Sequence, residues 1–276
     1  MEVNNRTEND ALVEQVRKPE FSAVGDNPIL LVPPGYGSSN VIDLEKYLPA
    51  PLRRRGTITL DDADSFIRYC VAQGIEGQSR IYCKADYEKS RVEFIGVLND
   101  YHDEPEWQDF RAVYAPATSV EWKRWTGNDR KPFGQVEFAT WLEDNNKDIA
   151  SVTDFPTGAE MLTMAKSLEI NQDMRIKSSI RLQSGGVSLE YVSKDDDATV
   201  TRMSVFERFA LGIAPFFNGQ AYQLEARLKY KSAGGTVQFW YELVRPDLVV
   251  QDATRELITV IGEKTAFPVL MGRVGA

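Results

Sequence analysis

The sequence predicts an α+β fold in which helices and antiparallel strands mostly occupy separate parts of the chain. In the first half, apolar residues recur at every third or fourth position in several segments, as in helices that pack on one side. From about residue 174 they recur at every second position, and glycine-containing turns join the runs. We therefore expect N-terminal helices around a small antiparallel sheet, followed by a C-terminal antiparallel β-meander that a C-terminal helix covers.

Three segments are expected on this basis. Residues 1–27 are polar and mixed in charge, and they should form a loosely held N-terminal arm. Residues 28–170 should form an α+β domain with a tryptophan-rich central segment, and residues 171–276 should form the antiparallel sheet and its helix. The boundary near residue 171 is placed where the period of the apolar residues changes from 3.6 to 2.

Within the first domain, one short helix is expected over 41–48 and a second from Thr59 to Gly74. Thr59 can cap the second helix, and the aspartates in its first turn favour the positive end of the helix dipole. Gly74 is a residue at which such a helix can end. Strand-like runs follow over 79–85, 91–98 and 110–115. These runs predict the small antiparallel sheet.

The segment 100–145 is expected to form the central packing layer. It holds four of the five tryptophans, namely Trp107, Trp122, Trp125 and Trp141. A large aromatic side chain contributes roughly 150–250 Å² of buried area in a core. Trp122 and Trp125 lie three positions apart, so one helical face can carry both rings inward. We therefore interpret these rings as core residues and not as a platform for nucleic-acid bases.

The second domain shows the clearest strand pattern. Apolar and polar residues alternate over 174–182 and 187–191, and a further strand is expected over 199–206. A hairpin is expected over 224–243, with its turn at 232–235. The final helix should begin at Pro246 and stop at Gly262, because proline is favoured at the first helical position and glycine just past the end. This helix should cover the apolar face of the sheet.

The composition excludes several classes of protein. The formal net charge of −9 disfavours nonspecific binding to nucleic acid, because phosphates are repelled at long range. Two cysteines are too few for a disulfide framework, and we interpret them as reduced thiols of a cytoplasmic protein. The sequence contains neither a secretory signal nor an apolar segment of roughly 20 residues, so no membrane association is expected. No catalytic or cofactor-binding motif stands out, and no cofactor is expected.

Two acidic loops are the candidate partner-binding sites. One surrounds the only histidine of the chain, and the other is a run of three aspartates. The candidate residues are Asp100, His102, Asp103, Glu104, Glu106, Asp109, Asp195, Asp196 and Asp197. The first loop could instead bind a divalent cation or supply general acid and base groups. Against this alternative, one histidine beside carboxylates lacks the spacing of a metal hydrolase, and Pro105 interrupts any helix that would align the ligands.

A basic sheet face is the candidate site for nucleic acid. Its residues alternate with apolar ones, so they could line up across neighbouring strands of the predicted meander and follow a phosphate backbone. The candidate residues are Arg175, Lys177, Arg181, Arg227, Lys229 and Lys231. Trp240 is the main aromatic residue there for stacking on bases, and Glu225 and Glu242 can interrupt the patch.

Several short motifs extend over nearly the whole chain from about residue 28. They are Leu44–Pro51 followed by Ser65-Phe66, Asp100-Tyr101-His102 with Trp107 and Arg111, Trp122 and Trp125, Gln135–Asn145 with Asp148, Glu190-Tyr191, Arg227–Tyr230 and Arg245-Pro246. In their order they resemble the YfdQ-like family of uncharacterised phage and prophage proteins. The resemblance implies a phage or prophage origin and action in the bacterial cytoplasm. It carries no established activity or catalytic residue.

The function expected from these observations is that of a non-catalytic accessory protein that binds and blocks a host protein complex. An antiphage-defence nuclease is the leading candidate partner, because an acidic and aromatic surface can cover a DNA-binding or assembly face. A homo-oligomer would suit such occlusion. Three alternatives stay open. The chain could be a DNA replication or recombination accessory protein that binds single strands through the basic face, an enzyme that uses the His102 loop, or a structural or morphogenetic protein.

Overall fold

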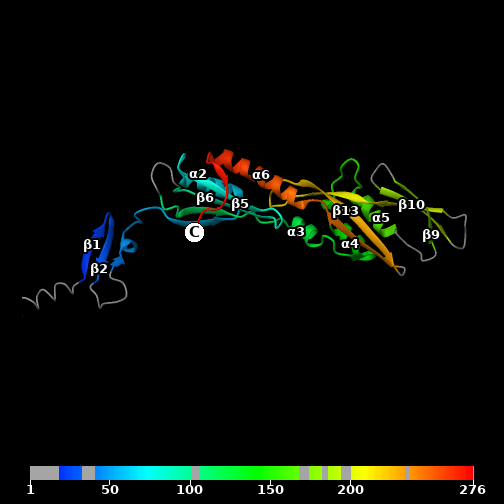
Figure 1. Ribbon diagram of the computed structural model, residues 1–276, viewed down its shortest axis with the longest axis horizontal. Helices are drawn as coiled ribbons and strands as arrows, with labels where there is room; N and C mark the ends of the chain where they lie inside the picture. Colours follow the sequence, from blue (N-terminus) through cyan, green and yellow to red (C-terminus); the bar gives the residue numbers. More distant parts are fainter. Residues whose placement is uncertain are drawn as a thin grey trace, which may run out of the picture. The chain divides into compact units, whose positions relative to one another are not determined.

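The computed structural model describes residues 19–32, 41–100, 106–167, 174–181, 186–193, 200–233 and 236–275. The chain forms two compact units, Met1–Gly56 and Thr57–Ala276, which we call unit 1 and unit 2 (Figure 1). This division differs from the boundaries expected near residues 28 and 171. The α+β class is confirmed. In the described ranges, no helix has the length and apolar character needed to cross a membrane.

Unit 1 contains a small antiparallel sheet. Strands β1 (Glu20–Val24), β2 (Asn27–Leu31) and β3 (Val41–Asp43) pair in that order, and the 3-10 helix η1 (Glu45–Tyr47) follows. Residues 20–27 of the predicted arm therefore belong to a sheet, while residues 1–18 lie outside the described ranges. Among the apolar side chains described in this unit, only that of Ile29 is buried.

The prediction of a helix over 41–48 is wrong. Val41 and Ile42 are β-branched and pair with β2. Asp43 then turns the chain, because its Oδ1 accepts a hydrogen bond from the backbone N–H of Glu45 at 2.8 Å. In so short a segment, a strand followed by a turn gives the same apolar spacing as a helix.

Unit 2 begins with a five-stranded sheet in the order β15-β5-β6-β7-β4. The predicted runs form β5 (Arg80–Asp86), β6 (Arg91–Val97) and β7 (Phe110–Tyr114), and these strands are antiparallel. One edge is β4 (Gly56–Leu60), and the other is β15 (Val269–Met271), which runs parallel to β5. The C-terminal segment therefore completes a sheet that otherwise comes from the first half of the chain.

Two helices pack beside this sheet, α2 (Ala63–Gln73) and α6 (Pro246–Thr265), and they contact each other. Asp62 caps α2 by accepting a hydrogen bond from the backbone N–H of Ser65 at 2.8 Å, whereas Thr59, the expected cap, lies in β4. The start of α6 at Pro246 is confirmed, but Gly262 lies inside the helix. A Cβ atom at Gly262 would lie 3.4 Å from Val269, which is an ordinary van der Waals distance.

The remaining strands of unit 2 form two sheets instead of the single predicted meander. Strands β12 (Arg208–Ile213), β13 (Tyr222–Ala233), β14 (Thr236–Leu243) and β8 (Phe133–Gly134) pair antiparallel in that order. Strands β9 (Met174–Arg181), β10 (Gly186–Ser193) and β11 (Val200–Phe206) form a separate three-stranded sheet. Since β8 and β15 pair across the predicted boundary at 171, that boundary does not separate two cores.

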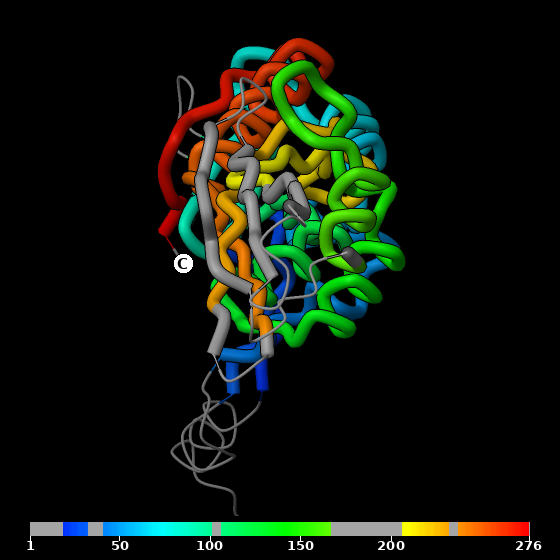
Figure 2. Tube along the Cα trace, turned by 90° about the vertical axis from the view of Figure 1, so that its right-hand side faces the viewer, coloured from blue at the N-terminus to red at the C-terminus, as the bar shows by residue number. Residues whose placement is uncertain are grey.

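Helices α3 (Val120–Gly127), α4 (Gln135–Asp144) and α5 (Gly158–Ser167) follow one another along the chain. Figure 2 shows these green helices beside the yellow and orange strands of the four-stranded sheet. The rings of Phe138 on α4 and Phe239 on β14 stack with centroids 5.0 Å apart. The predicted burial of Trp122 and Trp125 is confirmed, at 1% and 0% exposure, whereas Trp107 is 77% exposed and lies outside the core.

Candidate partner-binding pocket

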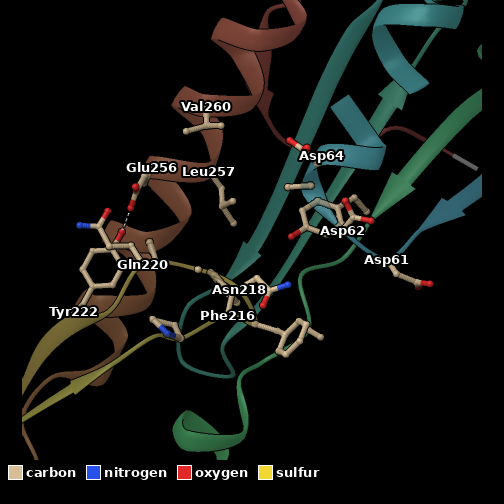
Figure 3. A pocket seen from close by; sticks show the side chains of 17 residues that line it. Asp61, Asp62, Asp64, Phe216, Asn218, Gln220, Tyr222, Glu256, Leu257 and Val260 are labelled. Carbon is tan, nitrogen blue, oxygen red and sulfur yellow. Dashed lines mark hydrogen bonds between the residues drawn. The ribbon is translucent and has the colours of Figure 1, made fainter. Parts of the chain in front are cut away.

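A pocket of about 490 Å³ lies in unit 2 where four segments meet. They are the start of α2, the end of β7 with the residues after it, the loop between β12 and β13, and the middle of α6. Its polar side chains include four carboxylates, from Asp61, Asp62, Asp64 and Glu256, and we call it the acidic pocket. Figure 3 shows the three aspartates on one side and Glu256 on the other.

The aspartates gather because α2 begins there. Asp62 accepts hydrogen bonds from both the backbone N–H and the hydroxyl of Ser65, at 2.8 and 2.7 Å, and these bonds hold the pKa of Asp62 below its ordinary value. Asp64 forms ion pairs with Arg68 at 3.1 Å and Lys264 at 3.6 Å. The carboxylate of Asp61 has no ion-pair partner among the described residues. Because its pKa is lowered, the Asp62 carboxylate is ionised at neutral pH.

The opposite side of the pocket is held by a hydrogen bond between two elements. The hydroxyl of Tyr222, at the start of β13, donates to the carboxylate of Glu256 on α6 (Figure 3). Burial raises the pKa of Tyr222, and the bond to Glu256 raises it further. The phenol is therefore protonated at neutral pH and can donate the hydrogen bond to Glu256.

A short loop closes the bottom of the acidic pocket. The backbone N–H of Phe217 donates to the carbonyl of Ala117 at 2.7 Å, and that of Gly219 donates to the carbonyl of Phe216 at 3.0 Å. Asn218 adopts a φ of 57°, which asparagine tolerates better than most residues. This turn buries the ring of Phe216 and leaves the ring of Phe217 64% exposed.

The apolar part of the pocket comes from Tyr114, Phe216, Ala253, Leu257 and Val260. None of the 17 lining residues is a serine, cysteine, histidine, lysine or arginine. Carboxylates next to aromatic and aliphatic surface suit a cation on an apolar stem, because the stem can pack while the charge meets a carboxylate. The residue types of this pocket therefore fit the binding of a basic side chain.

The acidic loop around residue 100 is placed differently from the prediction. Asp100 is buried at 2% exposure, and its carboxylate accepts hydrogen bonds from the hydroxyl of Tyr82 at 2.7 Å and from Gln108 Nε2 at 2.6 Å. A buried and bonded carboxylate cannot form a contact surface, so its assignment as a partner-binding residue is corrected. The pKa of Tyr82 is raised to about 12, mainly by burial and to a smaller extent by the hydrogen bond to Asp100.

The other predicted contact residues divide into two groups. Glu106 is exposed, and Asp109 is half-buried with its Oδ1 accepting a hydrogen bond from Asn99 Nδ2 at 3.0 Å. The remaining candidates His102, Asp103, Glu104, Asp195, Asp196 and Asp197 lie outside the described residues. Within the described part of the chain, no three His, Cys, Asp or Glu side chains are grouped closely enough to hold a metal ion.

The predicted basic face does not form as one surface. Arg175, Lys177 and Arg181 lie on β9 in the three-stranded sheet. Arg227, Lys229 and Lys231 lie on β13 in the four-stranded sheet, and their side chains are exposed. The six residues therefore occupy two different sheets, and only the second group has described side chains.

None of the four pocket carboxylates is among the residues predicted to contact a partner. The aspartates at 61–64 have a sufficient local explanation as the start of a helix, and Glu256 is one of several charges on a long amphipathic helix. Only the packing of α2 against α6 brings them together. No local sequence signal connects residues so far apart along the chain.

We compared the chain with family models, with curated proteins and with solved structures. A family model described as "Uncharacterized conserved protein (DUF2303)" matches residues 3–274. No curated protein and no solved structure matches the chain. The family description states no activity, so the function has to be argued from the site.

Proposed function

The chain belongs to the DUF2303 family of uncharacterised conserved proteins, and we propose that it is a non-catalytic phage or prophage accessory protein that binds and blocks a host protein complex. The proposed partner is an antiphage-defence nuclease, and the proposed place of action is the bacterial cytoplasm. The resemblance of the motifs between residues 44 and 246 to phage and prophage proteins supports the proposed origin. The mechanism is occlusion of a surface that the host complex needs.

The acidic pocket is the observation that carries this proposal. It combines four carboxylates with an apolar wall in about 490 Å³, and no lysine or arginine is among its lining residues. Nucleases hold DNA through arginine and lysine side chains that contact phosphates. An arginine from such a surface can place its aliphatic stem against Leu257 and Val260 and direct its guanidinium toward the carboxylates. An arginine held in this way is no longer available to DNA.

The charge of the whole molecule supports the same mechanism. With a formal net charge of −9, the protein is attracted to a positively charged DNA-binding face at long range. Complementary charge of this kind mainly raises the rate of association, and its effect decreases with increasing salt. Several copies acting together would cover a larger complex, so we include homo-oligomerisation in the proposal.

The test is purification of the tagged protein from host lysate after nuclease treatment, followed by assay of DNA cleavage by the recovered complex. We expect one complex in stoichiometric amount, with cleavage that is inhibited when the protein is present and restored when it is removed by salt. The double variant Asp61→Asn and Glu256→Gln should lose both binding and inhibition. Tyr222→Phe should retain them, since it removes the hydroxyl and keeps the carboxylate.

Glu263→Gln is the matched control, because Glu263 is an exposed carboxylate on the same helix but does not line the pocket. It should bind and inhibit as well as the unmodified protein. Circular dichroism establishes that each variant is folded. Full inhibition by the folded double variant would remove the acidic pocket from the mechanism, and loss of the complex on nuclease treatment would argue against direct binding.

A further inference from the structure

The outward face of the four-stranded sheet carries a row of basic side chains that the proposed function does not use. Side chains alternate along a strand, so Leu224, Ala226 and Leu228 of β13 point into the core, where they are buried. Arg227, Lys229 and Lys231 project from the other face, and all three are exposed. Basic residues at every second position of a strand lie about 7 Å apart in a straight row.

The neighbouring strands add an aromatic ring and a fourth cation to this row. The register places Trp240 of β14 directly opposite Lys229, and the side chain of Trp240 is partly exposed. Arg208 of β12 lies opposite Arg227 on the other side. Residues directly opposite each other in an antiparallel pair share a face of the sheet. We call the surface formed by Arg208, Arg227, Lys229, Lys231 and Trp240 the Trp240 face.

The carboxylates on this face neutralise only part of its charge. Arg208 Nη1 lies 3.5 Å from Glu225 Oε1, and Glu242 is the cross-strand neighbour of Arg227. Among the residues that the structure describes, no ion pair includes Arg227, Lys229 or Lys231. On the sheet face itself, Arg208, Arg227, Lys229 and Lys231 outnumber the carboxylates Glu225 and Glu242, although the net charge of the chain is −9. A positive patch on an acidic protein attracts an anionic ligand only at short range, because at longer range the ligand meets the negative charge of the whole molecule.

We propose that the Trp240 face binds single-stranded nucleic acid, with phosphates along the basic row of β13 and a base stacked on Trp240. Binding of single strands without sequence preference combines a positive track for the backbone with aromatic rings that accept any base. A duplex satisfies the phosphate contacts but keeps its bases stacked on each other, so it cannot use the ring. Because the row is short, we expect weak binding whose salt slope is modest, at about −0.7 for each phosphate contact.

The experiment measures fluorescence anisotropy of a labelled single-stranded oligonucleotide, of the same sequence as a duplex, and of inorganic polyphosphate as competitor. We expect the full-length protein to bind the single strand more tightly than the duplex at low salt. Trp240→Ala should weaken binding of the single strand by about tenfold or more and leave duplex binding nearly unchanged. Lys229→Gln with Lys231→Gln should weaken binding of both and lower the salt slope by about 1.4.

Lys123→Gln is the matched control, because Lys123 is an exposed lysine on α3 and does not belong to the Trp240 face. It should change neither the affinity nor the salt slope. No binding at low salt would overturn the proposal. Equal binding of single strand, duplex and polyphosphate, with no effect of Trp240→Ala, would also overturn it and leave a merely electrostatic surface. Variants of the acidic pocket should not affect this assay, so the two proposals fail independently.

Discussion

The side chain of Trp125 shows how one residue joins several elements. Its ring centroid lies 5.5 Å from that of Trp141 on α4 and 5.1 Å from that of Tyr241 on β14. Its Nε1–H donates to Asp148 Oδ2 at 2.7 Å, and its carbonyl accepts a hydrogen bond from the Tyr241 hydroxyl at 2.7 Å. Two α-helices, a strand and the 3-10 helix η2 (Asn146–Asp148) therefore depend on the position of this residue.

We expect Trp125→Ala to lower the free energy of unfolding by about 3–5 kcal/mol, because loss of a large buried ring leaves a cavity. The carboxylate of Asp148 also loses a donor. Urea-induced unfolding measures the change. Trp107→Ala is the matched control, since that ring is 77% exposed and its removal should cost about 1 kcal/mol or less. Equal losses in the two variants would contradict this account of the core.

Single residues differ in how well their roles can be predicted from sequence. The burial of Trp122 and Trp125 follows from their spacing on one helical face, which is local information. The burial of Asp100 does not, because its hydrogen-bond donors come from Tyr82 on another strand and Gln108 beyond the loop. From sequence alone, a carboxylate beside other acidic residues is predicted to be exposed to solvent, because the donors that surround it in the fold are not known.

At the scale of elements, α3 is connected to the acidic pocket through the residue that caps its beginning. Ser119 caps α3, and its hydroxyl accepts a hydrogen bond from the backbone N–H of Trp122 at 3.0 Å. The same hydroxyl donates to the carbonyl of Ala214, at 2.5 Å, just before the loop that closes the pocket. One buried hydroxyl thus fixes both the beginning of a helix and the position of that loop.

We expect Ser119→Ala to lower the free energy of unfolding by about 1–3 kcal/mol, since it removes the cap and leaves a carbonyl without its donor. Chemical unfolding monitored by tryptophan fluorescence measures the effect. Ser65→Ala is the control, because the hydroxyl of Ser65 donates to the exposed carboxylate of Asp62. Its removal should lower the free energy of unfolding by less than Ser119→Ala does. A Ser119→Ala protein as stable as the control would show that the loop is positioned by other contacts.

The elements themselves were predictable where the pattern is long. The helix α6 follows from a helical period that continues over its 20 residues. The segment 41–48 is too short for its period to distinguish a helix from a strand with a turn, and the pairing with β2 decides in favour of the strand. Gly262 resembles a helix end in the sequence, but it lies inside α6, which continues to Thr265.

For the molecule as a whole, the buried ionisable groups of unit 2 predict a loss of stability at alkaline pH. Burial raises the pKa of Cys70 from 9.0 to about 12 and that of Cys83 from 9.0 to about 11. Above about pH 9 the unfolded chain releases these protons while the native chain keeps them. The contribution of the two thiols to the free energy of unfolding is therefore fully present below about pH 9 and is lost as the pH rises toward 12.

The measurement is the urea midpoint of unfolding at about pH 8 and about pH 10.5, which should be lower at the higher pH. The variant Cys83→Ala has one buried thiol fewer and should lose less of its midpoint between the two conditions, even if its stability is lower at both. A midpoint that does not change with pH would mean that the thiols ionise as easily in the native protein as in the unfolded chain.

The arrangement of sheets in unit 2 was the least predictable feature. The change of period near residue 171 is real, since strands dominate from β9 to β14. It does not mark a domain boundary, because β8 and β15 pair with strands on the other side of it. This pairing could not be predicted, since β8 has only two residues and β15 only three, and such short strands carry no sequence pattern of their own. Their pairing with distant strands joins the two halves into one unit.

The parallel pairing of β15 with β5 has a consequence for the order of folding during synthesis. Residues 81–83 leave the ribosome long before residues 269–271, so the edge of β5 has no partner while most of the chain is being made. An unpaired strand edge is a site of aggregation, and contacts distant in sequence form slowly. Unit 2 can close this sheet only after translation has passed Met271. The edge of β5 therefore stays without its strand partner until β15 has been made.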